Sequence, residues 1–307
     1  MGVLTHNRGS RELGGDYHPQ TVAWASRMLA ANYQVTAYQK NVHTKFCNKL
    51  KEAGVIDGII QFIVPVWESA LPNMVSVLTS NYTASIQGAL SHSPLGVKPT
   101  NNTSYIRSGL ESGNWPSGLS TQNSGQLYYT VGSNNAFEFD MGARNYDGVT
   151  AQAGLVLGNA ANSVNALSGT SVNPILYGAV ASESEHLLCF NSSPEGQRLM
   201  KQITPGTVAN IGSVQPIGTG TLPDSTYPFC ALNTVGTGIQ LNTLGRYHKA
   251  FMLFKDATNS QAALICSAVY NFVNTIIPAV FIGSYISYNG INLAYNGADI
   301  LFTNITP

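Results

Sequence analysis

The chain has 307 residues, 44% of them hydrophobic, and its 15 basic and 15 acidic side chains give a formal net charge of zero. Charged residues make up only 10% of the sequence, against about 25% in a typical protein. The ordinary apolar fraction excludes a disordered chain, and the scarcity of basic residues excludes the positive face that nucleic acid requires. Because a net charge near zero favours association, we expect a subunit of a larger assembly rather than a freely diffusing enzyme.

The first part of the chain is expected to form an arm and two helices. Residues 1–20 contain several glycines and show no hydrophobic period, so an extended arm is expected there. The arm is predicted to dock on a neighbouring subunit through two basic residues and one aromatic residue, Arg8, Arg11 and Tyr17. Residues 21–31 form a short helical candidate, and apolar residues recur at helical spacing over 35–54, with Gly54 as the expected C-cap.

The central region has the composition of a β-sheet protein. Gly, Ser, Asn and Thr alternate with short apolar runs, a pattern that disfavours helices and favours short strands joined by tight turns. The expected strands fall at 59–67, 154–157, 175–180, 186–191, 208–211, 229–232 and 247–254. Phe139 and Met141 are expected on one face of a further strand, and Glu138 and Asp140 on its other face. The predicted fold class is therefore mainly β, an antiparallel sandwich.

A second amphipathic helix is expected near the C-terminus, capped by Ser260 and ended by Pro278. An Asn-Gly dipeptide at 289–290 then predicts a β-hairpin, because these residues adopt the positive φ angles of a type I′ turn. The chain is therefore expected to divide into an arm with a short helix, a helix with a β-sandwich, and a β-extension, at 1–34, 35–278 and 279–307.

The cysteines are scattered, with no Cys-x-x-Cys pair and no histidine at zinc-finger spacing; they are Cys47, Cys189, Cys230 and Cys266. We therefore expect buried, reduced thiols, no metal and no cofactor. The longest apolar stretch, residues 276–286, is too short to cross a bilayer, so no membrane insertion is expected. Residues 1–15 also lack the apolar core of a secretion signal.

Motifs that would indicate catalysis are missing from the sequence, which has no phosphate-binding loop, no His-Glu-x-x-His and no Gly-x-Ser-x-Gly. Glu138 and Asp140 share a strand face, as the two acids of a retaining glycosidase could. The next position on that face, Gly142, has no side chain, so we expect these acids to be polar residues of an exposed strand or partners of Arg144. A second group is expected to be solvated: Glu183, Glu185 and His186. The protein is therefore predicted not to be an enzyme.

Aromatic residues offer a candidate binding surface. Trp115 lies in the loop sequence Gly-Asn-Trp-Pro-Ser-Gly, where an exposed ring could stack on a sugar. Tyr128 and Tyr129 follow in the next stretch and are expected to share in the contact. These three residues are the predicted contacts with a glycan or receptor.

The order of elements resembles a known family. After the helix at 35–54 and the apolar strand at 59–67 come four short runs, SHSPLGV at 91–97, NNTSYI at 101–106, MGAR at 141–144 and YNFV at 270–273. Over residues 35–277 the chain resembles the concanavalin A-like (laminin-G-like) jelly-roll domain of bacteriophage virion structural proteins. The resemblance implies a two-sheet antiparallel jelly roll with a role in a tail, fibre or capsid surface, sometimes in contact with host glycans. The arm and the C-terminal extension depart from that pattern and favour assembly contacts.

Together these predictions favour a non-enzymatic bacteriophage virion structural protein, a tail, fibre or capsid-surface component. Its expected partners are other copies of itself, other virion proteins and a host-surface glycan. Its expected location is the virion, after assembly in the cytoplasm of the host bacterium. The alternative function is a carbohydrate-binding adhesin or receptor-binding protein. A double jelly-roll capsid protein and a divergent glycoside hydrolase are less favoured alternatives.

Overall fold

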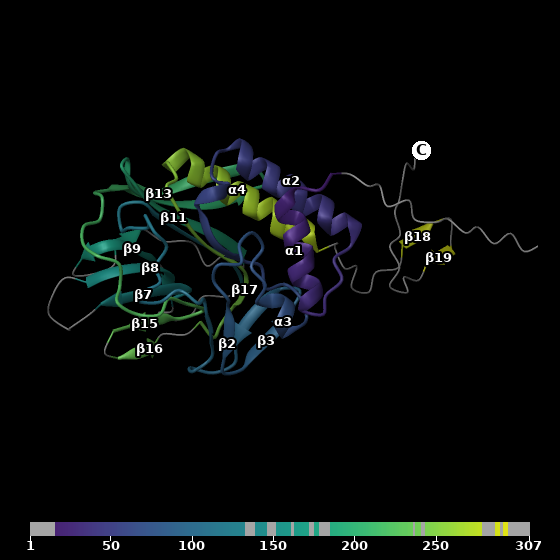
Figure 1. The fold of residues 1–307 in the computed structure, drawn as a ribbon, viewed down its shortest axis with the longest axis horizontal. Helices are drawn as coiled ribbons and strands as arrows, with labels where there is room; N and C mark the ends of the chain where they lie inside the picture. The colour runs from purple at the N-terminus through teal and green to yellow at the C-terminus, as the bar shows by residue number, and fades with distance from the viewer. Residues whose placement is uncertain are drawn as a thin grey trace, which may run out of the picture.

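The computed structural model describes residues 16–132, 139–145, 152–160, 163–171, 175–177, 185–235, 237–240, 243–277, 286–288 and 291–293. Two β-sheets pack face to face, and the long helices cover the outer face of one of them (Figure 1). The layers are therefore helices, a first sheet and a second sheet. The prediction of a mainly β sandwich is confirmed at this level.

The helix-covered sheet is antiparallel and takes its strands from distant parts of the chain. Its order is β13 (Thr207–Gln215), β12 (Gly196–Thr204), β11 (Glu185–Ser193), β6 (Ser124–Val131), β17 (Tyr247–Lys255), β4 (Gly96–Pro99) and β3 (Leu90–Ser93). β1 (Ile59–Ile63) also pairs with β17. β6 and β17 therefore lie in the interior of the sheet, with strands on both sides.

The second sheet is mixed, because one of its strand pairs is parallel. Its order is β10 (Ile175–Tyr177), β9 (Ser163–Ser171), β8 (Gln152–Ala160), β7 (Met141–Asn145), β14 (Pro228–Phe229), β5 (Tyr105–Arg107) and β2 (Ser85–Gln87). β15 (Leu232–Thr234) runs parallel to β7 and pairs with β16 (Gly238–Gln240). We call it the mixed sheet below.

The helix layer consists of α1 (Pro19–Ala30), α2 (Ala37–Glu52) and α4 (Asn259–Ile276). In α4 the hydroxyl of Thr258 accepts from the N–H of Gln261, whose side chain accepts from the N–H of Thr258. This capping box places the cap at Thr258 instead of the predicted Ser260. The remaining described elements are the 3₁₀-helix η1 (Ile56–Gly58), α3 (Ala70–Asn73), and the hairpin strands β18 (Ile286–Tyr288) and β19 (Ile291–Leu293). Among the described helices, none is long and apolar enough to cross a bilayer.

Successive side chains of β6 point to opposite faces of the sheet, and a separate hydrophobic core covers each face. Tyr129 packs in the core under the helices, whereas Tyr128 packs in the core between the sheets. In the core between the sheets, the rings of Phe229 and Phe251 stack with centroids 4.8 Å apart, so that one ring from each sheet meets the other. Because both faces of β6 are covered, residues 124–130 are all buried.

Four of the seven predicted strands lie within observed ones: 154–157, 186–191, 208–211 and 247–254 lie within β8, β11, β13 and β17. The strand predicted at 59–67 is observed only as β1 (Ile59–Ile63), and the strand predicted at 175–180 is described only over β10 (Ile175–Tyr177), since residues 178–180 lie outside the described residues. The stretch 229–232 divides into two strands instead, because Cys230 adopts a positive φ of 63°. Phe139 and Met141 pack in different clusters instead of on one strand face, since β7 begins only at Met141. The division of the chain after residues 34 and 278 stays a prediction.

Candidate binding site at the Trp115 loops

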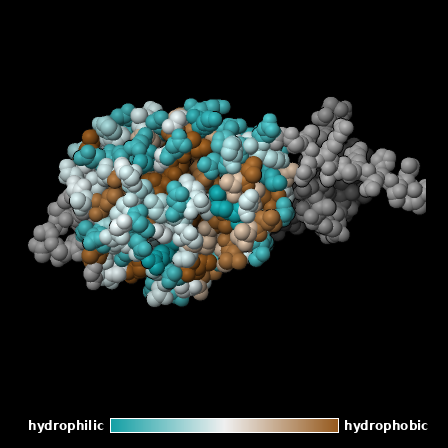
Figure 2. Space-filling model, in the orientation of Figure 1, coloured by the Kyte–Doolittle hydropathy of each residue, from teal (hydrophilic) through white to brown (hydrophobic). Residues whose placement is uncertain are grey.

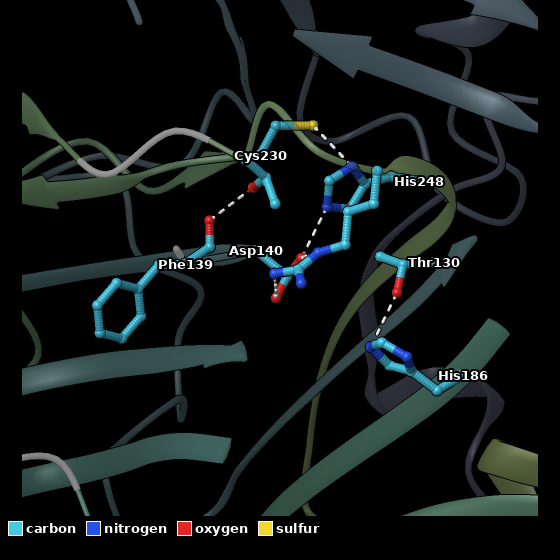
Figure 3. A network of polar contacts seen from close by, with 8 residues as sticks. Thr130, Phe139, Asp140, His186, Cys230 and His248 are labelled. Atoms are coloured by element: carbon cyan, nitrogen blue, oxygen red, sulfur yellow. Dashed lines mark hydrogen bonds and ion pairs between the residues drawn. The ribbon is translucent and has the colours of Figure 1, made fainter. Parts of the chain in front are cut away.

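A fully buried ion pair lies between the two sheets (Figure 3). The carboxylate of Asp140 accepts hydrogen bonds from Nε and Nη2 of Arg246, at 2.8 and 2.9 Å, and from Nε2 of His248, at 2.8 Å. All three side chains are 0% exposed. Asp140 directly precedes β7 of the mixed sheet, Arg246 directly precedes β17 of the helix-covered sheet, and His248 is the second residue of β17. The pair therefore ties one sheet to the other.

The protonation states of this group follow from its surroundings. Burial alone would raise the pKa of Asp140, but the charge of Arg246 and the hydrogen bond from His248 lower it, so the carboxylate is ionised. Burial lowers the pKa of His248 despite the neighbouring carboxylate, which leaves a neutral ring whose Nε2–H donates to Asp140. Its Nδ1 lies 3.6 Å from Sγ of Cys230, and burial raises the pKa of that thiol, which stays protonated.

Cys230 contacts His248, and His248 contacts Asp140. A cysteine nucleophile, its general base and the acid that orients the base are linked in the same order. A nucleophile of that kind needs a thiolate that a substrate can reach. The thiol of Cys230 is 0% exposed and has a raised pKa, so this group is part of the core. The sequence predicts that Asp140 lies on an exposed strand or pairs with Arg144. Both predictions are wrong, because Asp140 is buried and pairs with Arg246. Arg144 donates to the hydroxyl of Thr234 at 3.1 Å, and Glu138 lies outside the described residues.

β11 separates two residues that were expected to lie together in solvent. His186 is buried and faces β6, with Nε2 3.0 Å from the hydroxyl of Thr130 (Figure 3). Glu185 is exposed and accepts from the hydroxyl of Tyr129 at 2.5 Å. Successive residues of a strand point to opposite faces, so these two side chains cannot share a metal ion. Glu183 lies outside the described residues, and within them no group of three metal-binding side chains occurs.

Tyr128 and Tyr129 are core residues of β6, with 0% and 1% of their surface exposed. Tyr128 lies edge-on to the ring of His186, with centroids 5.9 Å apart, and Tyr129 lies against Tyr270 of α4 at 5.7 Å. The expectation that this pair is exposed to a glycan is therefore corrected. The cause is the position of β6, an interior strand covered by helices on one face and by the mixed sheet on the other.

Trp115 keeps part of its surface in solvent and lies where segments from distant parts of the chain meet. Its indole Nε1 donates to the carbonyl of Pro223 at 3.1 Å, and its ring is edge-on to the buried ring of Tyr227, with centroids 5.9 Å apart. Tyr82, also partly exposed, donates its hydroxyl to the carbonyl of Asn114 at 3.2 Å. The indole is therefore held in one orientation against the ring of Tyr227, and Tyr82 is hydrogen-bonded to the residue that precedes Trp115.

Polar side chains border Trp115. Ser112 donates its hydroxyl to the carboxylate of Asp224, and the N–H of Asp224 donates to the side-chain oxygen of Asn145 at 3.1 Å. The side chain of Asn114 bridges two backbone groups of its own loop. We call the set formed by Trp115 and its neighbours the Trp115 loops; its members are Tyr82, Ser112, Asn114, Trp115, Asn145 and Asp224. It offers carboxylate and amide groups beside an ordered aromatic ring.

Arg107 and Lys255 are cations in or next to the Trp115 loops, and both are engaged. Nη2 of Arg107 lies 2.5 Å from the carboxylate of Glu111, and Nζ of Lys255 donates to the carbonyl of Ser117 at 2.8 Å. Asp224 adds a negative charge that neither of these cations neutralises. Nζ of Lys255 also lies 3.3 Å from the carboxylate of Asp256, so an acid balances each of these two cations, and among the described residues no cation pairs with Asp224.

Of the three residues predicted to form an assembly arm, only Tyr17 is among the described residues. Arg8 and Arg11 lie outside the described residues. Tyr17 is half-buried, and Nζ of Lys40 in α2 lies 5.7 Å from the centre of its ring. Tyr17 therefore contacts its own chain, and docking of the arm on another subunit stays a prediction.

Sequence analysis singled out Trp115 but missed its neighbours. Tyr82, Asn145 and Asp224 lie 30 or more positions away in the sequence and carry no motif. The partners of Asp140 were missed for the same reason, since Arg246 is 106 positions from it. A single sequence contains no local signal for such pairings.

No protein-family model matches the chain, and no curated protein matches it. Solved structures match its fold at low identity. A Trypanosoma rangeli sialidase in complex with 2,3-difluorosialic acid matches with a TM-score of 0.50 and 11% identity, over 76% of this chain and 40% of that one. The binding domain of botulinum neurotoxin serotype D matches with a TM-score of 0.46 and 14% identity, over 71% and 52%. A CBM40 domain of a Ruminococcus gnavus sialidase matches with a TM-score of 0.34 and 8% identity, over 48% and 84%.

These similarities define a class of fold and no more. The chain spans less than half the length of the sialidase, and at 11% identity that match shows a likeness of fold alone. The other two matches have TM-scores below 0.5 and add nothing to the assignment. Function has to be argued from the residues of this chain.

Proposed function

We propose that this protein is a non-catalytic carbohydrate-binding module that takes a neutral sugar on the Trp115 loops. The observation that carries the proposal is a partly exposed, fixed indole bordered by the carboxylate of Asp224 and the amides of Asn114 and Asn145. A sugar ring has an apolar C–H face and a rim of hydroxyl groups. The aromatic ring suits that face, and carboxylate and amide groups suit the hydroxyls.

The loops favour binding without a large rearrangement. The hydrogen bond to Pro223 and the contact with Tyr227 prevent the indole of Trp115 from rotating. Ser112 bonds one carboxylate oxygen of Asp224, which leaves the second oxygen for a ligand hydroxyl. Side chains that are ordered before binding lose little conformational entropy when the ligand arrives.

The charges on the loops support a neutral ligand. An acidic sugar carries a carboxylate, which is bound most strongly by an arginine or a lysine. Arg107 is already paired with Glu111, and Asp224 is negative, so an acidic sugar would meet repulsion at the Trp115 loops. A neutral hexose meets no such penalty.

Binding to a panel of immobilised neutral glycans tests the proposal. Trp115→Ala should weaken binding at least about tenfold, or about 1.4 kcal/mol, because it removes the stacking surface. Tyr38→Ala, which removes an exposed ring of α2 far from these loops in sequence, is the matched control and should bind like the unmodified chain. Thermal unfolding of each variant checks that the fold is intact. Unchanged binding by Trp115→Ala, or a chain that binds no glycan, would reject the proposal.

A second proposed function is a structural subunit of a bacteriophage virion, which requires contacts with other protein chains, and a different observation favours such contacts. Val22 and Leu29 are exposed apolar residues on one side of α1. With Tyr17 and Lys40 they line a shallow hollow of ≈ 290 Å³. Polar residues complete the lining of the hollow, and Figure 2 shows groups of hydrophobic residues among hydrophilic ones on the face in view. A mixed surface of this kind, on a chain with 10% charged residues, suits contact with another protein. Light scattering on the full chain and on a chain lacking residues 1–15 tests this function. An oligomer that needs those residues supports it, and a monomer in both forms rejects it.

A further inference from the structure

β13 forms an edge of the helix-covered sheet (Figure 1). It pairs with β12 on one side, and no described residue pairs with its other side. Most of its residues are exposed and the rest half-exposed. A row of backbone N–H and C=O groups along this nine-residue strand is therefore presented to solvent.

Over the described residues, the other strands at the ends of the two sheets are short. β3, at the opposite end of the same sheet, has four residues, and β2 and β10, at the ends of the mixed sheet, have three each. Shortness is one way in which proteins prevent an edge from pairing with another chain. β13 is twice as long as β3, so this protection does not apply to it.

β13 also lacks the side chains that usually protect an edge. From Gln202 to Pro223 the sequence has no charged residue, and within Thr207–Gln215 it has no proline. Irregularities in the pairing with β12 fall between residues 207 and 208 and between residues 211 and 215, and residues 208–211 pair in regular register. Residues 208–211 are therefore a regularly paired segment, and no charged side chain occurs anywhere along the strand.

Exposed apolar side chains border this edge. Ile203 lies at the end of β12, Val214 lies in β13, and Ile217 lies two residues beyond its end. All three are exposed large hydrophobic residues. An open strand edge with apolar side chains beside it is a surface that gains by being covered.

We propose that β13 is an interaction surface for a second copy of this chain. The two β13 strands pair antiparallel about a twofold axis, so that the helix-covered sheets of the two copies continue as one. A twofold axis places the same strand opposite itself, and antiparallel pairing then satisfies the open N–H and C=O groups of both copies. Two copies of an uncharged strand meet no like-charge repulsion across that axis.

Sedimentation velocity over a wide range of protein concentration tests this pairing. The full chain should form a dimer, and the double substitution Asn210→Lys/Val214→Lys should weaken its dissociation constant at least tenfold. Both positions are exposed, so lysines there should leave the fold intact while repelling each other across the axis. Leu95→Lys is the control, because Leu95 is an exposed apolar residue, 49% against 40% for Val214, in the turn between β3 and β4.

Hydrogen exchange gives a readout that needs no substitution. Amides of β13 should gain protection as the protein concentration rises, whereas amides of β3 should not change. Removal of residues 1–15 should leave this dimer intact, which distinguishes it from an oligomer built by the N-terminal arm. Any of three results would overturn the proposal. The chain stays monomeric at every concentration, the double lysine substitution leaves the dimer dissociation constant unchanged, or hydrogen exchange in β13 does not depend on protein concentration.

Discussion

Asp140→Asn removes the negative charge that faces Arg246 between the sheets while keeping the shape of the side chain. In the native protein Oδ1 accepts from Nε of Arg246 and Nε2 of His248, and Oδ2 accepts from Nη2 of Arg246. An asparagine oxygen at the first position keeps two of these bonds. Its NH₂ group at the second position places a donor against the donor of Arg246, at a site where both side chains are 0% exposed.

The expected loss in unfolding free energy is about 3–5 kcal/mol, the cost of leaving one charge of a buried pair uncompensated. That is a large part of a total stability of about 5–15 kcal/mol. Urea denaturation measures it, with an unchanged slope showing that the folded and unfolded states are otherwise comparable. Glu111→Gln breaks the exposed pair with Arg107 and is the control, with an expected loss of about 0–1 kcal/mol.

A double substitution tests the reasoning further. Arg246→Met added to Asp140→Asn should recover part of the loss, because it removes the charge that the first change leaves without Asp140 as its partner. A loss of less than about 1 kcal/mol for Asp140→Asn alone, or strict additivity of the two changes, would refute the view that this ion pair ties the sheets together.

Two further predictions concern stability. Burial lowers the pKa of His43 to about 3 and lowers the pKa of His248, so the unfolded chain takes up these protons at a higher pH than the folded chain does. The unfolding free energy should therefore fall, by up to about 1.4 kcal/mol per pH unit for each histidine, as the pH drops below about 6.5. His43→Gln should reduce this slope in urea titrations, and stability that does not change between about pH 7 and pH 5 would contradict it. Gly96→Ala should lower the melting temperature, because a Cβ there would lie 2.1 Å from the carbonyl oxygen of His248. Gly113→Ala is its control, since Gly113 also has a positive φ but nothing lies within 4 Å of its Cβ, and equal losses would remove the clash as the cause.

The helices and many strands could be predicted from the sequence because their signals are local. Helical spacing over 35–54 corresponds to α2, and the Asn-Gly dipeptide at 289–290 lies between β18 and β19. The cap of α4 was missed by two positions because Ser260 and Thr258 are both good capping residues. Gln261 decides between them, since a capping box needs a Glu or Gln three residues after the cap.

The burial of polar and aromatic residues could not be predicted in the same way. Tyr128 and Tyr129 are adjacent, so a sheet with one face in solvent would expose one of the two side chains. Both are buried because helices cover one face of β6 and a sheet covers the other, which depends on how distant segments pack. Asp140 looked like a residue of an exposed strand because its partner Arg246 is 106 positions away.

The most direct test of the proposed function is a fluorescence titration with neutral and sialylated oligosaccharides of matched length. Trp24 and Trp67 are 1% and 6% exposed, so a change in tryptophan emission on ligand binding reports mainly on Trp115. The expected result is a saturable change with a neutral oligosaccharide, absent in Trp115→Phe, and a weaker or absent change with its sialylated counterpart. Tighter binding of the sialylated ligand would contradict the neutral-sugar assignment alone. No saturable change with any sugar would contradict carbohydrate binding at the Trp115 loops.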